Sequence, residues 1–95
     1  KIAAMAEAFQ VPVAPHDCTG PVLLCASVHH SLNATNALVQ EVVRAFYYGW
    51  YQDLVTDLPP IEDGHIRAPD GPGLGLALQP DVLKRPDCQI TRTAL

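Results

Sequence analysis

Apolar residues recur along the first half of the chain in runs that short polar stretches separate. The opening residues fall at helical spacing: Ile2, Met5, Ala6 and Phe9. The next apolar run, Val11 to Ala14, is short enough for a strand, although Pro12 is tolerable only at its beginning or at a sheet edge. We therefore predict the end of an amphipathic helix over residues 1–9 and a strand over residues 11–14.

A longer apolar stretch follows the loop that contains His16. Thr19 or Gly20 can cap a helix here, because Pro21 then occupies the first helical position, where its missing N–H costs nothing. The helix is expected to run from about residue 21 to residue 32 with one apolar stripe: Leu24, Val28 and Leu32. Further apolar residues spread around most of its circumference, so we expect it to be covered on more than one side.

A second strand is predicted over residues 36–41, which contain the apolar run Ala37-Leu38-Val39 and end on Gln40 and Glu41. The order of predicted elements is then helix, strand, helix, strand, with short links between them. This alternation indicates an α/β fold with a parallel sheet built from βα units.

Beyond Arg44 the chain carries an aromatic cluster: Phe46, Tyr47, Tyr48, Trp50 and Tyr51. These side chains could line a substrate cleft, but packing against other parts of a larger protein is the simpler interpretation. Without such partners the cluster would form an exposed patch that promotes association. A homo-oligomer is therefore expected.

Turn residues divide the rest of the chain. Asp63-Gly64 lies between Ile61-Glu62 and His65-Ile66, which is the signature of a β-hairpin with a two-residue turn. The GPGLG stretch over residues 71–75 favours a tight turn, because it lacks the spacing of a phosphate-binding loop. Residues 79–85 predict a short C-terminal helix, and no pattern follows Pro86.

Composition restricts the class of protein. The 95 residues suit one small domain, and the 48% hydrophobic content is ordinary for a globular protein. The net charge of −4 and the scattered Lys and Arg residues argue against nucleic acid or an anionic membrane surface as a partner. No apolar run approaches the ~20 residues of a membrane span.

The cysteines indicate the cellular compartment, and the first residues indicate whether the chain is part of a longer protein. Three cysteines without CxxC spacing argue against a disulfide framework or a zinc knuckle, so a cytoplasmic location is expected. The sequence opens on Lys1 within a helical pattern that no capping residue precedes. We expect it to be the C-terminal piece of something longer.

Candidate chemistry lies at the ends of the two predicted strands. His16 follows the first strand and Glu41 ends the second, 25 positions later, whereas one βαβ unit takes roughly 30 residues. Parallel strands would bring both side chains to the same edge of the sheet. An imidazole and a carboxylate there could together handle an acidic C–H beside a carboxyl group. Asp17 is a poor partner for His16, because neighbours on an extended stretch point apart.

Several sequence blocks resemble the enolase superfamily. "MAEAF", "VPVAPHDCTGPV", "NALVQE" and "EDGHIRAPDGPGLGLAL" occur in the order of its C-terminal portion and cover about residues 4–83. Within the superfamily, the mandelate racemase-like acid-sugar dehydratases, such as galactonate dehydratase and its relatives, are the most similar. The expected fold is therefore the C-terminal part of a (β/α)7β TIM-like barrel. Residues 1–45 match the last two strands and the helix between them, and residues 46–95 match the return segment, hairpin and helix of the capping domain.

The resemblance also implies a reaction. The histidine of the "APH" motif, an acid/base, falls on His16. The glutamate of the "QE" motif, which hydrogen-bonds the substrate carboxylate as it becomes an enediolate, falls on Glu41. A sugar acid (an aldonate or aldarate) is the implied substrate and Mg²⁺ the implied cofactor. Neither the metal ligands nor the opposite acid/base matches a position in this chain, so the rest of the barrel is a required partner and the isolated chain is expected to be inactive.

Other interpretations stay open. His16 could be a loop histidine bonded to a backbone carbonyl, and Glu41 a solvated strand end. Structural roles are favoured for the remaining candidates: His29 and His30 on the outer side of the helix, Cys18, Cys25 and Cys88. The whole chain could instead be a non-catalytic, self-associating remnant or interaction module. A small metal-binding module that uses the four His and three Cys residues is a third hypothesis, and racemisation is an alternative to dehydration.

Overall fold

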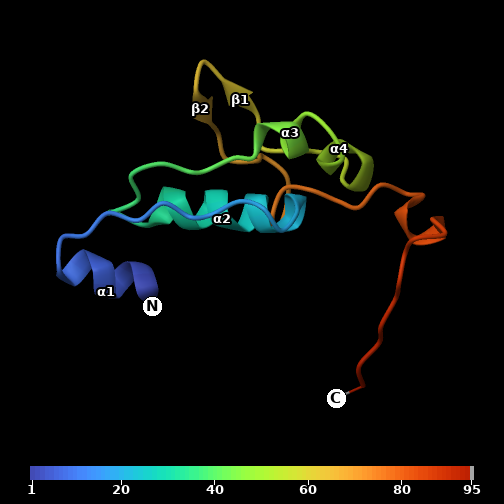
Figure 1. The fold of residues 1–95 in the computed structure, drawn as a ribbon, viewed down its shortest axis with the longest axis horizontal. Coiled ribbons are helices and arrows are strands. Elements are labelled where there is room, and N and C mark those ends of the chain that lie inside the picture. Colours follow the sequence, from blue (N-terminus) through green and yellow to red (C-terminus); the bar gives the residue numbers. More distant parts are fainter. Residues whose placement is uncertain (95) are drawn as a thin grey trace.

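The computed structural model describes residues 1–94. Its elements, in order, are α1 (Ile2–Ala8), α2 (Pro21–Asn33), α3 (Arg44–Tyr47), α4 (Tyr51–Leu54), β1 (Ile61–Glu62), β2 (His65–Ile66) and a 3-10 helix, η1 (Val82–Lys84). Helix α2 runs through the middle of the molecule (Figure 1). The hairpin, α3 and α4 lie on one side of it and α1 lies on the other, while the C-terminal tail extends away from the rest.

Helix α2 contributes buried side chains to the hydrophobic core. Gly20 is its N-cap residue and Pro21 opens it, as the sequence predicts. Leu24 and Val28, one turn apart, are buried against Tyr47 of α3 and Tyr51 of α4. The aromatic cluster therefore divides: these two tyrosines fill the core, whereas Tyr48 and Trp50 are exposed.

The prediction that α2 is covered on more than one side holds for the middle of the helix, where Leu24, Cys25 and Val28 are buried and His29 contacts the 71–75 turn, but not for its ends. Leu32 continues the predicted stripe but is 61% exposed, because the helix extends past the residues that cover Leu24 and Val28. Val22 and Leu23, in the first turn, are exposed as well. The apolar residues at both ends of α2 thus contact solvent.

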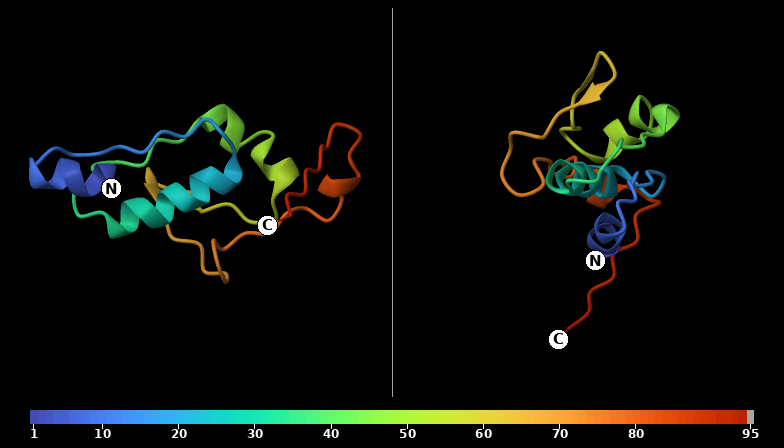
Figure 2. Two further views of the ribbon diagram at one scale, coloured as in Figure 1. Left: turned by 90° about the horizontal axis from the view of Figure 1, so that it is seen from below. Right: turned by 90° about the vertical axis from the view of Figure 1, so that its left-hand side faces the viewer.

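The two predicted strands run side by side but do not form a regular sheet. Their backbones meet in a single parallel bridge, Val13 with Ala37, which two hydrogen bonds of 2.9 Å make. Proline rings leave residues 12 and 15 without N–H donors. Side-chain amides instead reach the first segment: Asn36 Nδ2 donates to the Val11 carbonyl at 3.0 Å and Gln40 Nε2 to the Pro15 carbonyl at 3.3 Å. In Figure 2 the two segments lie next to each other along α2.

The hairpin prediction is confirmed. Ile61 pairs with Ile66, and Glu62 with His65, in an antiparallel ladder. Asp63 and Gly64 both have positive φ, 49° and 76°, as a type I′ turn requires.

The GPGLG stretch forms the predicted tight turn. The Gly75 N–H donates to the Pro72 carbonyl at 3.0 Å. Gly75 has φ of 80°, and a Cβ added there would lie 2.1 Å from the Cβ of Pro69. This position therefore requires glycine for its backbone conformation and for space.

We expect Gly75→Ala to lower the free energy of unfolding by about 1–3 kcal/mol, because it adds left-handed strain and a clash with a proline ring. Gly73→Ala is the matched control: Gly73 has φ of 65° but no atom within 4 Å of an added Cβ. Urea titration of both variants measures the difference. Equal losses would show that the Pro69 contact contributes nothing.

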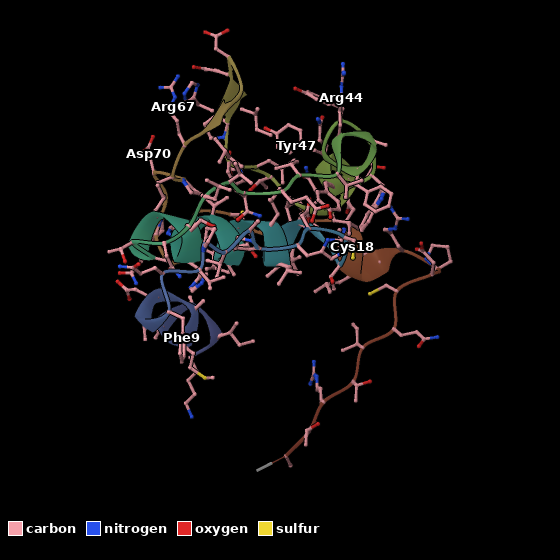
Figure 3. All side chains as sticks on the ribbon, turned by 60° about the vertical axis from the view of Figure 1, so that its left-hand side comes forward. Phe9, Cys18, Arg44, Tyr47, Arg67 and Asp70 are labelled. Carbon is pink, nitrogen blue, oxygen red and sulfur yellow. The ribbon has the colours of Figure 1, made fainter. Side chains whose placement is uncertain are left out.

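The two ends of the chain differ from the sequence prediction. The C-terminal helix is only the single 3-10 turn of η1, because Arg85 precedes Pro86 and is extended, with ψ of 141°. Helix α1 forms as expected, but none of its residues is buried. In Figure 3 the Phe9 side chain points away from α2. Polar contacts hold α1 in place, including an Asn36 Nδ2 hydrogen bond to the Ala3 carbonyl at 3.1 Å.

Within residues 1–94, no helix combines the length and the apolar character that crossing a bilayer requires.

Candidate functional site

His16 and Glu41 lie together where the two parallel segments end. The His16 Nδ1 atom is hydrogen-bonded to Glu41 Oε2, and the two side chains are 69% and 46% exposed. The bridge between Val13 and Ala37 sets this register, because it places residues three and four positions further along each segment at the same end. The structure thus brings together the two residues that the sequence marks as candidates; their catalytic roles stay a prediction.

The Glu41 carboxylate accepts two hydrogen bonds on the same oxygen. The Asp17 N–H donates to Oε2 at 3.0 Å, and His16 is the second partner. The backbone N–H of Asp17, and next the His16 hydrogen bond, lower the pKa of Glu41 below its ordinary value. Glu41 is therefore an ionised acceptor near neutral pH, and His16 Nδ1 carries the donated proton.

We expect His16→Ala to raise the pKa of Glu41 toward its ordinary value, since one of the two donors to the carboxylate is lost. Carbon-13 NMR titration of the Glu41 carboxyl measures this change. Because folding lowers this pKa, the contribution of Glu41 to stability is present above its unfolded pKa and is lost as the pH falls through the folded pKa. An unchanged Glu41 pKa in the variant would show that the pair does not form in solution.

Asp17 is a buried carboxylate directly beside this exposed pair. Its side chain is fully buried, and two donors satisfy it: the Tyr51 hydroxyl donates to Oδ1 at 2.8 Å and the Val43 N–H donates to Oδ2 at 3.1 Å. Its side-chain hydrogen bonds go to Tyr51 and Val43, whereas the His16 ring is hydrogen-bonded to Glu41. Burial, and then the Asp17 carboxylate, raise the pKa of Tyr51, so its hydroxyl stays protonated.

The described residues do not form a magnesium site by themselves. No three His, Cys, Asp or Glu side chains within residues 1–94 are grouped so that they could hold a metal ion. Asp17 is the carboxylate nearest the candidate pair in sequence, but Tyr51 and Val43 already occupy its oxygens. The arrangement of the described His and Cys side chains therefore gives no support to the hypothesis of a small metal-binding module.

The remaining histidines and cysteines of the described residues make no hydrogen bond to the His16 or Glu41 side chain. The sequence predicts His29 on the outer side of α2, but the 71–75 turn covers it and it is half-buried. Its Nε2 atom is hydrogen-bonded to the Leu74 carbonyl at 3.2 Å. His30 is exposed, as expected. Cys18 is exposed near the beginning of α2 (Figure 3), and Cys25 is buried, which raises its thiol pKa to about 11.

Two residues at the site have roles that the sequence does not indicate. In sequence terms Asp17 is only a neighbour of His16, and Tyr51 is only one member of an aromatic cluster. Their hydrogen bond joins positions 34 residues apart. No spacing rule in one sequence indicates such a pair.

Comparison with known proteins identifies the family. The sequence profile of the "Enolase C-terminal domain-like" family matches residues 1–82. The chain belongs to this family. The predicted resemblance to the enolase superfamily is therefore confirmed, and so is a TIM-barrel-type α/β fold at that level of detail.

Named relatives of this enolase-family chain include sugar-acid dehydratases. A D-galactonate dehydratase of Xanthomonas campestris pv. campestris is 41% identical over 90 residues, which cover 90% of this chain and 24% of that protein. A D-xylonate dehydratase of Haloferax volcanii is 36% identical over 84 residues, 88% of this chain and 20% of that protein. The chain thus spans about a quarter or less of these relatives.

Solved structures agree with the assignment to the enolase family. A crystal structure of an enolase of the mandelate racemase subgroup from Agrobacterium tumefaciens superposes with a TM-score of 0.79 at 65% identity, covering 87% of this chain and 22% of that one. An enolase protein from the environmental sequences of the Sargasso Sea gives a TM-score of 0.80 at 52% identity, covering 90% and 22%.

Proposed function

We propose that this chain is the part of a sugar-acid dehydratase that supplies His16 and Glu41 to the active site. The single observation that carries the proposal is the hydrogen-bonded His16–Glu41 pair at the shared end of two parallel segments. The names of the D-galactonate and D-xylonate dehydratases among its relatives support an aldonate or aldarate as the substrate.

The proposed reaction is a β-elimination. The proton on the carbon next to the carboxylate is removed, the β-hydroxyl leaves as water after protonation, and the resulting enol rearranges to a 2-keto-3-deoxy acid. His16 suits the proton-transfer role because Nδ1 is hydrogen-bonded to Glu41, so the neutral imidazole that carries its proton on Nδ1 has Nε2 as a base on the opposite side of the ring. Glu41, which accepts from His16 and from the Asp17 N–H in this structure, must take up a proton from solvent as substrate binds before it can donate a hydrogen bond to a substrate carboxylate.

The rest of the site must come from outside this chain. We propose that residues 1–45 form the last two strands of the barrel with the helix between them, and that residues 46–95 return to the capping domain. The core that joins Leu24 with Tyr51 then ties these two parts together. Any Mg²⁺ that the complete protein uses is expected to have its ligands on other strands of that protein.

The proposal is tested by product formation in the longer protein that carries this segment. Incubation with a panel of aldonates and aldarates in the presence of Mg²⁺ should release a 2-keto-3-deoxy acid from at least one of them, measured by a carbonyl-specific reagent. Exchange of the α-hydrogen for deuterium without keto acid would indicate a racemase instead. Neither product nor exchange in a folded protein would contradict the proposal.

Self-association is the second candidate function, and the surface of the chain favours it. The chain exposes 7131 Å², whereas a compact protein of its mass exposes about 5,400 Å². Its radius of gyration is 15.2 Å, against roughly 12 Å for a compact domain of this length. Ile2, Met5 and Phe9 add an exposed apolar face on α1. Sedimentation at micromolar concentration should therefore show an oligomer, and a compact monomer would contradict this function.

A further inference from the structure

Asp17 lies between the exposed His16–Glu41 pair and the buried core, and it contacts both. Its backbone N–H donates to Glu41 Oε2, while its side chain accepts from Tyr51 and from the backbone of Val43. We propose that Asp17 is a positioning residue for the Glu41 carboxylate and that the Tyr51 hydroxyl fixes Asp17 in place. The catalytic meaning of this arrangement rests on the proposed function; the arrangement itself does not.

The contacts form one continuous path from the buried core to the exposed His16–Glu41 pair. Tyr51 is fully buried against Leu24 and Val28, and its hydroxyl donates to Asp17 Oδ1 at 2.8 Å. A buried carboxylate is costly unless hydrogen bonds satisfy it, so Asp17 is held where its two donors lie. The Asp17 N–H then points at Glu41 Oε2, the oxygen that also binds His16.

Asp17 also holds Glu41 from the other segment. Val43, which donates to Asp17 Oδ2 at 3.1 Å, is two residues past Glu41. Gln40 Nε2 donates to the Glu41 carbonyl at 2.8 Å, but the hydrogen bonds to the side-chain carboxylate within residues 1–94 come from the His16 ring and the Asp17 N–H. The direction of the carboxylate thus depends on how firmly Asp17 is fixed.

The test compares two buried tyrosines of the same core. Tyr51→Phe removes the hydroxyl that holds Asp17 and keeps the ring. Tyr47→Phe is the matched control, because the Tyr47 hydroxyl donates to the Pro59 carbonyl at 2.9 Å, away from Asp17. In carbon-13 NMR titrations of the whole chain, Tyr51→Phe should raise the pKa of Glu41, since a displaced Asp17 N–H stabilises the carboxylate less. Tyr47→Phe should leave it unchanged.

A purely structural role for Tyr51 would lower stability in both variants and leave the Glu41 pKa the same in both, which would overturn the proposal. A second measurement needs no variant. In the unmodified chain the amide proton shift of Asp17 should follow the titration of the Glu41 carboxyl, and an Asp17 amide that ignores this titration would also overturn the proposal.

Kinetics in the longer protein separate this inference from the proposed function. Tyr51→Phe should lower kcat/KM about tenfold or more, because misplacing a group that binds the substrate by a fraction of an ångström is costly. Tyr47→Phe should stay within about twofold of the unmodified protein. A protein that dehydrates no sugar acid contradicts the proposed function but leaves the NMR result for Asp17 intact.

Discussion

In the longer protein that carries this segment, His16→Asn should lower kcat for sugar-acid dehydration by about 10²–10⁴-fold. General acid–base catalysis by a positioned side chain contributes a factor of this size. Asparagine is the informative replacement, because its amide can still donate a hydrogen bond to Glu41 but has no basic nitrogen in the place of Nε2. The loss then reports proton transfer and not the loss of a partner for Glu41.

The control for this prediction is His30→Asn. His30 is exposed on α2 and has no contact with the His16–Glu41 pair, so kcat should be unaffected. Initial rates of keto-acid formation under substrate saturation measure both variants. Unchanged dehydration by His16→Asn would remove His16 from the reaction and leave it as an ordinary loop histidine.

The second large effect concerns the core on which the site rests. Leu24→Ala should lower the free energy of unfolding by about 2–5 kcal/mol, because Leu24 is fully buried against Val28, Tyr47 and Tyr51 and its truncation leaves a cavity. A small domain has only about 5–15 kcal/mol of stability, so this is a large part of the total.

Leu32→Ala is the matched control, since the same change on the same helix removes a side chain that is 61% exposed. Its effect should stay within about 0.5 kcal/mol. Chemical denaturation followed by far-ultraviolet circular dichroism gives both values. Equal losses at the two positions would mean that another part of the molecule covers Leu32, or that the core around Leu24 is loose.

Local sequence signals predicted the elements that depend on local chemistry. Asp63-Gly64 predicted the hairpin because few residue pairs adopt positive φ in succession. Gly20 and Pro21 predicted the beginning of α2, since capping depends on the residues at the end of the helix itself. The length of a βα unit predicted that His16 and Glu41 lie at the same end of the two parallel segments.

Features that depend on distant residues could not be predicted in the same way. The segments around Val13 and Ala37 have the composition of strands, but the extent of their pairing depends on how the chain between them folds, and here one bridge forms. The exposure of Leu32 depends on where the aromatic cluster packs. The link between Asp17 and Tyr51 depends on the fold of the intervening 34 residues. Tertiary contacts, not local pattern, decided each of these.

The central claim is that His16 and Glu41 together bind and deprotonate a sugar acid. A crystal structure of the longer protein with an unreactive sugar-acid analogue tests it most directly. The claim predicts that the analogue carboxylate lies within hydrogen-bonding distance of Glu41 and that its α-carbon faces His16 Nε2. An analogue bound elsewhere, with the two side chains still paired to each other and open to solvent, would contradict it.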